Sequence, residues 1–307
     1  MFRHYFKTGL RNLSRNKSYS FINILGLSIG IAASLLIFLV FQFETSFDNF
    51  HKKKNSIYRV GTESHSQDGI SYSAGVSFPV GPQLRIDFPQ IKEVASIFKR
   101  EGQVTIDNGN RQSKKFNEDN FYYAEPEFFE MFDFGWLAGN PQTCLMNPRN
   151  VVLTKTTAEK YFGDWHSAIG RTIKYDNHDL FTVAGILKDI PANSDFPLSI
   201  IVPYSALKNT SIISNLTDWV SIYGSAYTFV VLPPKLPVEK FNSQLKAFAK
   251  RHKPAEYAAD APFAQPLTEI HYDGRFGNYN RHTFSHQLIN ALVLIGIVLV
   301  ISVVARF

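Results

Sequence analysis

Residues Ile22–Phe43, INILGLSIGIAASLLIFLVFQF, form an apolar run that contains no charged residue. As an α-helix, these 22 residues extend about 33 Å, which matches the hydrocarbon thickness of a bilayer. A second apolar run, Leu288–Ala305 (LINALVLIGIVLVISVVA), has 18 residues and is still in the transmembrane range. The sequence therefore predicts two membrane-spanning helices that flank a large intervening region.

A secretory signal peptide is the alternative explanation of the first run. Its apolar region has only about 7–15 residues and ends at a cleavage site of small residues. Here the run is longer and is followed by the bulky side chains of Phe41, Phe43 and Phe47. The sequence favours an uncleaved helix.

The net charge of +6 lies at the two ends of the chain. Five cations precede the first run without any acid among them, namely Arg3, Lys7, Arg11, Arg15 and Lys17, and Arg306 follows the second. By the positive-inside rule, these residues set the topology with the N-terminus in the cytoplasm, so that residues 44–287 lie outside. The neutral region between the helices lacks the basic face of a nucleic-acid-binding protein, and no nucleic-acid partner is expected.

Two further patterns occur beside and within the first run. Apolar residues alternate with cations every three or four positions in residues 2–17, which predicts a basic amphipathic helix on the inner membrane surface. Gly26 and Gly30 form a GxxxG pattern, which lets a second helix approach closely. We therefore expect membrane lipid as a partner and a helix–helix contact at these two glycines.

The region between the helices is predicted to be α+β. A strand at Ser56–Glu63, a helix opened by Pro79 and two strands around a Glu101-Gly102 turn, Val94–Lys99 and Gln103–Asp107, are predicted first. A similar strand–helix unit follows much later, at Ala226–Leu232 and Pro237–Lys250. The separation of these units predicts an α/β domain of βα units, interrupted by a β-rich insertion. The predicted parts are a cytoplasmic-face helix (1–17), a first transmembrane helix (18–43), the first half of the α/β subdomain (44–113), the inserted subdomain (114–223), the second half (224–287) and a second transmembrane helix (288–305).

Within the insertion, the sequence predicts several short elements. They are an aromatic helical segment at Phe128–Phe134, a strand at Asn150–Thr154, a helix at Thr156–Phe162 capped by Thr156, a hairpin of Arg171–Tyr175 with Leu180–Leu187, and a strand at Ile200–Pro203.

Motifs that carry chemistry are absent from the sequence. It contains no phosphate-binding loop, no GxGxxG, HExxH or GxSxG motif and no paired cysteines. His282 and His286 are one helical turn apart without further ligands nearby, and Cys144 is better explained as a packed side chain than as a nucleophile. Acidic clusters such as Glu118-Asp119 and Glu125, Glu127 and Glu130 are interpreted as surface charge. We therefore predict no catalytic, cofactor-binding or metal-binding residue and no enzymatic activity in this chain.

Three stretches carry a resemblance to a known family. The first runs from Leu10-Arg11-Asn12-Leu13 into Ile22–Phe43 and on through Phe47-Asp48 and Phe50-His51. The second runs from Phe128-Phe129-Glu130-Met131-Phe132 through Tyr161-Phe162-Gly163 to Asp189-Ile190-Pro191-Ala192-Asn193-Ser194, and the third is Pro266–His271. The chain thereby resembles the N-terminal part of a MacB-like ABC transporter permease of the FtsX superfamily.

The resemblance implies a multi-pass protein of the cytoplasmic (inner) membrane with a large periplasmic domain. It implies a separate cytoplasmic P-loop ATPase subunit and a second permease copy as partners, with a periplasmic adaptor or substrate protein as a further one. In such systems the periplasmic domain moves when the ATPase closes, which is called mechanotransmission. Because the family's permease domain continues after the second span, the resemblance also predicts that these residues are a fragment.

Two other functions fit parts of the pattern. A two-span sensor with an extracytoplasmic ligand-binding domain has the same topology but predicts a signalling segment after the second span. A membrane-tethered hydrolase predicts a cleft with convergent acids or an activated nucleophile. The substrate is not determined by the sequence.

Overall fold

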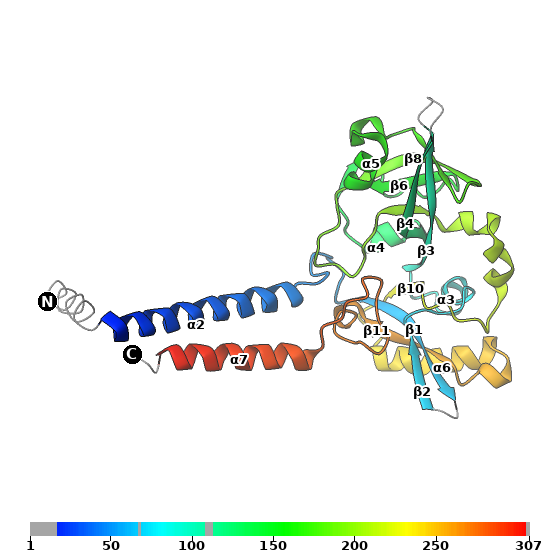
Figure 1. Cartoon of the computed structure of the whole chain (residues 1–307). Helices are drawn as coiled ribbons and strands as arrows, with labels where there is room; N and C mark the ends of the chain where they lie inside the picture. The colour runs from blue at the N-terminus through cyan, green and yellow to red at the C-terminus, as the bar shows by residue number, and fades with distance from the viewer. Residues whose placement is uncertain (1–16, 67–68, 108–112, 305–307) are drawn as a thin grey trace. The chain divides into compact units, whose positions relative to one another are not determined.

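The structure is a computed structural model that describes residues 17–66, 69–107 and 113–304 (Figure 1). The predicted amphipathic helix and four of its cations, Arg3, Lys7, Arg11 and Arg15, lie outside the described residues. The chain divides into two units, which are described separately: one contains the two apolar helices, and the other is the domain Phe47–Thr283.

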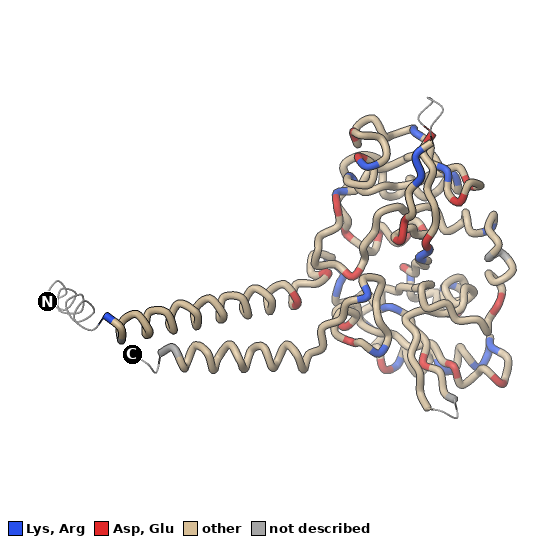
Figure 2. The backbone as a smooth tube through the Cα atoms, in the orientation of Figure 1, with Lys and Arg blue, Asp and Glu red and all other residues tan. Residues whose placement is uncertain are grey.

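The apolar unit consists of α2 (Lys17–Glu44) and α7 (His286–Val304), which pack along one another in antiparallel directions (Figure 1). Lys17 and Glu44 are the charged residues of α2, and Figure 2 shows the tube of this helix without charge between its ends. Among the described residues, Ser20–Glu44 is long and apolar enough to cross a membrane, whereas the apolar part of α7, His286–Ser302, is shorter. The first predicted span is therefore an apolar helix of the required length.

A single mixed sheet of eleven strands forms the framework of the domain Phe47–Thr283. Its main path is β11-β1-β10-β3-β4-β9-β6-β8-β5, with β2 paired to β1, and β7 paired to β3 and β8. The strands are β1 (Ile57–Ser66), β2 (Gly69–Ser73), β3 (Val94–Asp107), β4 (Ser113–Ala124), β5 (Trp136–Ala138), β6 (Asn150–Thr154), β7 (Thr172–Tyr175), β8 (Asp179–Leu187), β9 (Ile200–Pro203), β10 (Ala226–Val231) and β11 (Ala261–Pro266). Pairing is antiparallel except between β4 and β9 and between β6 and β8.

The strand order reproduces the predicted interruption of one α/β subdomain by another. β10 lies between β1 and β3, so the strand that follows the insertion completes the sheet that the chain began before it. The fold class is thus confirmed as a mixed α/β domain with a β-rich insertion behind an N-terminal apolar helix. The two parts share one sheet, because β3 and β4 run through both.

Helices cover one face of the first subdomain. They are α3 (Val80–Asp87) and α6 (Val238–His252), and the insertion carries α4 (Phe128–Met131) and α5 (Lys155–Phe162). Short 3-10 helices occupy the connections at Trp165–Ser167, Tyr204–Asn209, Ser211–Thr217, Ala255–Tyr257 and Leu267–Glu269. Leu84, Phe88, Phe241 and Phe248 pack with Val230 beneath α3 and α6. The opposite face of the same strands is covered by a cluster of aromatic side chains, Phe128, Phe132, Phe196, Phe229 and Tyr279.

Two predicted elements differ from the structure near Gly102. Val94–Lys99 and Gln103–Asp107 are not two strands around a turn but one continuous strand, β3, with an irregularity in its pairing between Arg100 and Gly102. A Cβ atom on Gly102 would lie 2.4 Å from the ring of Tyr175. The glycine is therefore required for the close approach of β7 rather than for a turn.

Two predictions in the insertion also need correction. The aromatic segment is helical only over Phe128–Met131, and the backbone of Phe132 is extended. The aromatic side chains of this segment are spread over a buried surface rather than along one helix face. The helix α5 begins at Lys155 and not at Thr156. The first turn is not capped by the side chain of Thr156: the backbone N–H of Thr156 donates to Asp189 Oδ1 at 2.9 Å.

Candidate functional site

Three segments that are far apart in the sequence meet in the interior of the domain. Residues 47–51 follow α2, residues 193–196 connect β8 to β9, and residues 271–282 precede α7. We define the buried polar cluster as the side chains from these segments that contact one another, namely Asp48, Ser194, Asp195, His271 and Asn278. All five side chains are buried.

Asp48 fixes the segment 193–195 through both of its carboxylate oxygens. Oδ1 accepts a hydrogen bond from Ser194 Oγ at 2.6 Å, and Oδ2 accepts one from the backbone N–H of Asp195 at 3.0 Å. The backbone N–H of Asp48 donates to the carbonyl of Asn193 at 3.0 Å. Asp48 has a positive φ of 51°, a conformation that aspartate tolerates better than most residues but that still costs energy. The local geometry is thus stabilised by these three contacts.

His51 extends the contacts of Asp48 toward the aromatic cluster. Its Nε2 lies 3.7 Å from Asp48 Oδ1, and its Nδ1 accepts a hydrogen bond from the backbone N–H of Asp133 at 2.9 Å. The imidazole also stands edge-on to the rings of Phe132 and Phe134. His51 therefore links residues 47–51 to the chain beyond α4.

Asp195 is the second buried carboxylate of the cluster. Its Oδ1 accepts a hydrogen bond from Asn278 Nδ2 at 2.8 Å and lies 3.2 Å from His271 Nδ1. Burial and the nearby charge of Asp48 raise the pKa of Asp195, although the hydrogen bond with His271 opposes that shift. The imidazole of His271 is stacked on the ring of Phe47, with centroids 3.5 Å apart. One contact network therefore joins residues from all three segments.

Asn278 and its neighbours attach the last segment to the sheet. Asn278 Nδ2 also donates to the carbonyl of His282 at 2.6 Å. The hydroxyl of Tyr279 donates to the carbonyls of Ile97 and Ser225, at 3.1 and 2.9 Å. Residues 278–282 are in this way held to β3, to β10 and to the insertion.

Arg59 of β1 also contacts the segment 271–282. Its guanidinium is fully buried, donates to the carbonyl of Gly277 at 2.9 Å and to Gln265, and lies over the ring of Tyr227 at 4.8 Å. Burial lowers the pKa of Arg59, while the nearby carboxylate of Asp195 opposes that change. A buried cation at this position is stabilised by oxygens and a ring face rather than by water.

The cluster lies close in the chain to both apolar helices. Asp48 follows the last residue of α2, Glu44, after four positions, and His282 precedes the first residue of α7, His286, by four positions. The cluster therefore joins both connections to the apolar helices with the segment 193–196 of the insertion. Ser194 donates to a carboxylate rather than to a histidine, which is not the geometry of an activated nucleophile.

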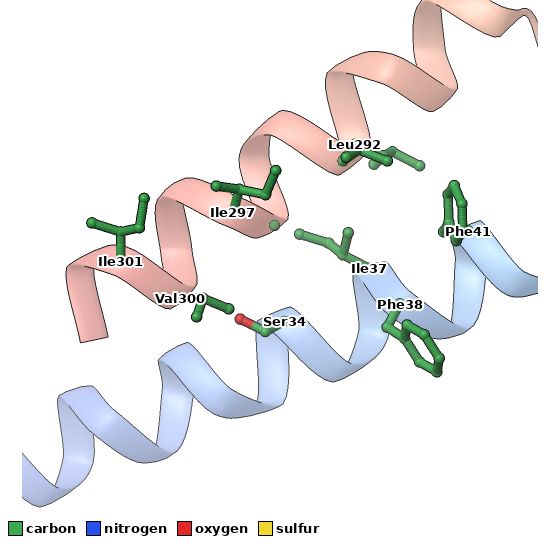
Figure 3. A pocket seen from close by; sticks show the side chains of 10 residues that line it. Ser34, Ile37, Phe38, Phe41, Leu292, Ile297, Val300 and Ile301 are labelled. Atoms are coloured by element: carbon green, nitrogen blue, oxygen red, sulfur yellow. The ribbon is translucent and has the colours of Figure 1, made fainter. Parts of the chain in front are cut away.

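The predicted helix-contact residues lie on α2. Gly30 is buried and Gly26 is half-buried, and the carbonyl of Gly30 accepts a hydrogen bond from Ser34 Oγ at 2.8 Å. Ser34 and Ile37 line a groove of about 350 Å³ against Gly296 and Val300 of α7 (Figure 3). A contact at Gly26 and Gly30 with a further helix stays a prediction. Lys17, the one predicted topology-setting cation among the described residues, is exposed at the start of α2.

Other candidate residues have structural roles. Cys144 is buried, its thiol donates to the carbonyl of Ala184 at 3.2 Å, and burial raises the pKa of the thiol. Glu118 accepts hydrogen bonds from Lys160 Nζ and from the hydroxyl of Tyr161, each at 2.7 Å, so it ties β4 to α5 and is more than surface charge. His178 lies in the exposed turn between β7 and β8, beside Asp179.

The sequence did not indicate the roles of Asp48, Arg59 or Asp195. Asp48 and Ser194 lie in the stretches that carry the family resemblance. Arg59 is a cation between apolar residues of the predicted strand SIYRVGTE, and this is the signal that could have revealed it. The hydrogen-bond partners are set by tertiary contacts between residues as many as 218 positions apart.

The chain thus combines a mixed α/β domain with an apolar helix before it and another after it. The family model described as the MacB-like periplasmic core domain matches residues 20–248. The chain belongs to this family, the periplasmic core domain of MacB-like ABC transporter permeases. A search of curated proteins finds no match.

Solved structures with a similar fold have low sequence identity to the chain. A domain of a protein assigned as a permease, from Porphyromonas gingivalis, is 17% identical, covers 79% of this chain and 99% of its own, and has a TM-score of 0.57. The periplasmic region of MacB from Actinobacillus actinomycetemcomitans is 15% identical, with 71% and 91% covered and a TM-score of 0.49. The extracellular domain of the ABC-type transporter YknZ from Gram-positive bacteria is 16% identical, with 67% and 99% covered and a TM-score of 0.46.

Proposed function

We propose that this chain is a permease subunit whose periplasmic domain moves when a separate cytoplasmic P-loop ATPase subunit hydrolyses ATP. The observation that carries the proposal is the buried polar cluster. It joins the residue four positions after α2 to the segment before α7 and to the insertion. A displacement of either helix would therefore act on the same hydrogen-bond network, and the network would pass it to both parts of the sheet. Family membership supplies the expectation of an ATPase partner.

The proposed arrangement in the membrane follows from the charges. Four cations before α2 and Lys17 at its start favour an N-terminus in the cytoplasm, with residues 44–287 in the periplasm and α7 as a second span of the inner membrane. Cysteine labelling tests this in a Cys144→Ala background. Ile169→Cys, exposed on the insertion, should react with a membrane-impermeant maleimide in spheroplasts, whereas Lys17→Cys should react only after permeabilisation. Labelling of Lys17→Cys in intact spheroplasts would contradict the orientation.

Coupling to the ATPase is tested with two labels in the domain. Ile70→Cys on β2 and Ile169→Cys in the insertion are both exposed, so a fluorophore pair on them reports the separation of the two subdomains. The protein is purified from its own membranes with its ATPase, which first tests the association. Trapping the ATPase in its ATP-bound state should shift the distance distribution. Failure to recover an ATPase, with this chain or with a longer reading frame, would reject the proposed function.

The role of the cluster in that coupling needs a matched pair of variants. Asp48→Ala removes the carboxylate that holds Ser194 and the backbone of Asp195. Asp107→Ala removes an exposed carboxylate at the end of β3. We expect the first variant to retain the ATPase but to lose the ATP-dependent shift, and the second to retain both. An unchanged shift in Asp48→Ala would show that the cluster does not transmit the motion.

A further inference from the structure

A cleft of about 550 Å³ lies between the first subdomain and the insertion. Its wall on one side is α3 with the residues before it, and its other walls are the β4–α4 connection, the loop around Met146 and the 3-10 helices Tyr204–Asn209 and Ser211–Thr217. The volume is in the range of small-molecule binding sites and is too small for a folded partner. The cleft is separate from the buried polar cluster, since no residue of that cluster lines it.

The lining of the cleft is mainly apolar and ends in an exposed apolar mouth. Phe78 and Leu145 are buried in its lining, and Pro82 and Leu216 add further apolar surface. Met146 lines the mouth with 68% of its surface exposed. A methionine held in water at the mouth of an apolar cleft contributes nothing to the core, but its flexible thioether adapts well to varied apolar ligands.

Met146 is thus a large exposed apolar side chain that borders a concave and mainly apolar surface. This is the pattern of a ligand site rather than of scattered surface residues.

The charges that line the cleft cancel. Arg85 and Glu125 form an ion pair, and each makes one more hydrogen bond. Arg85 donates to the carbonyl of Val94 at 2.8 Å, and Glu125 accepts a hydrogen bond from the backbone N–H of Ser96 at 2.7 Å. Lys208 and Glu127 carry opposite charges. The lining therefore has no net charge, and an ion that entered the cleft would lose its hydration without meeting an excess of opposite charge, so an uncharged occupant is favoured.

We propose that this cleft binds an uncharged, mainly apolar small molecule that carries one hydrogen-bonding group. The apolar lining would bury its body, and the hydroxyl of Ser205 or the ammonium of Lys208, both exposed side chains of the lining, would donate to its polar group. The proposal goes beyond the proposed function, because binding at this site needs neither ATP nor a partner subunit. Its test therefore fails or succeeds independently of the ATPase experiments.

Photolabelling with benzophenone tests the proposal on the full chain in lipid nanodiscs. Benzophenone is uncharged, has two apolar rings and one carbonyl acceptor, and upon irradiation inserts into nearby C–H bonds. Adducts are mapped by mass spectrometry, with α2 and α7 as the internal reference for probe dissolved in lipid. We expect adducts at the cleft that saturate and fall at least five-fold with an excess of diphenylmethanol, which has a similar shape but no photoreactive carbonyl. Adducts on α2 and α7 should not be competed.

Substitutions at the mouth provide the matched controls. Met146→Asp places an unpaired charge at the mouth and should lower labelling of the other lining residues about ten-fold, whereas Met146→Leu should leave it unchanged. Ile70→Asp, at another exposed apolar position on β2, should also leave it unchanged. The proposal is wrong if labelling is confined to α2 and α7, if cleft labelling does not saturate, or if Met146→Asp labels like the wild type.

Discussion

Asp48 and Ser194, 146 positions apart in the sequence, are joined by a buried hydrogen bond of 2.6 Å. The carboxylate holds a second donor, the backbone N–H of Asp195, so one side chain organises the connection between β8 and β9. Because the donors are buried, they would lose a partner without gaining water if Asp48 were shortened. This contact is the link between the segment after α2 and the insertion.

The first prediction concerns the stability of this link. Asp48→Ala should lower the free energy of unfolding by about 2 to 4 kcal/mol, because it leaves two buried donors without an acceptor. Asp48→Gly removes the same carboxylate but tolerates the positive φ of 51°, so it should be more stable than the alanine variant by about 1 kcal/mol. Denaturant unfolding of the purified chain measures both. Asp107→Ala, at an exposed site, should be neutral; equal loss in all three variants would contradict the hydrogen-bond explanation.

The second prediction concerns the pH dependence that Asp195 contributes. Burial, above all, raises the pKa of Asp195 in the folded state. The unfolded chain, with a pKa of about 3.9, therefore releases this proton first, and stability falls as the pH rises from about 4 through the folded-state pKa. Asp195→Asn cannot ionise and should gain stability relative to wild type across that window. The measurement is unfolding of both proteins from pH 4 to pH 8, and a wild type that gains stability relative to the variant would overturn the prediction.

How well the sequence predicted an element depended on whether nearby residues alone determine that element. The strand Asn150–Thr154 and the apolar run Ile22–Phe43 were predicted closely, because composition and length alone specify them. Gly102 was misinterpreted as a turn residue, since only the position of the Tyr175 ring shows that a glycine is needed within a strand. The cap of α5 was missed for the same reason, because Asp189 lies 33 positions away from Thr156.

The buried polar cluster was even less accessible to sequence reasoning. Each of its residues is an ordinary polar residue near a predicted boundary, and its chemistry appears only when three distant segments are brought together. The family resemblance drew attention to Asp48, Ser194 and His271 without giving any of them a role. The burial of Asp195 between Asn278 and His271 is a tertiary property that no local pattern contains.

The third prediction follows from Gly102. A Cβ atom there would lie 2.4 Å from the ring of Tyr175, which is itself buried and stacked on Phe121. Gly102→Ala should therefore destabilise the domain by about 2 to 3 kcal/mol, since the ring cannot move without disturbing the core. Gly224→Ala is the control, because the nearest atom to its added Cβ would be 4.0 Å away. Comparable stability of the two variants would show that β7 can move away at little cost.

The last prediction concerns the contact between α3 and α6. Asp87 accepts hydrogen bonds from Gln83, Arg251 and His252, the latter two at 2.7 and 2.8 Å. Burial would raise the pKa of Asp87, but the hydrogen bonds from His252, Gln83 and Arg251 outweigh it and lower the pKa to about 2.

Because that value lies below the unfolded-state pKa, the stabilisation is complete above about pH 4 and is lost as the pH falls toward 2. Asp87→Asn should cost on the order of 1 kcal/mol at pH 7, after allowance for screening by solvent near the surface. The difference between wild type and variant should shrink as the pH is lowered from 4 to 2, as followed by denaturant unfolding. A difference that stays constant over this range would mean that packing of α3 against α6, rather than the charge of Asp87, stabilises the contact.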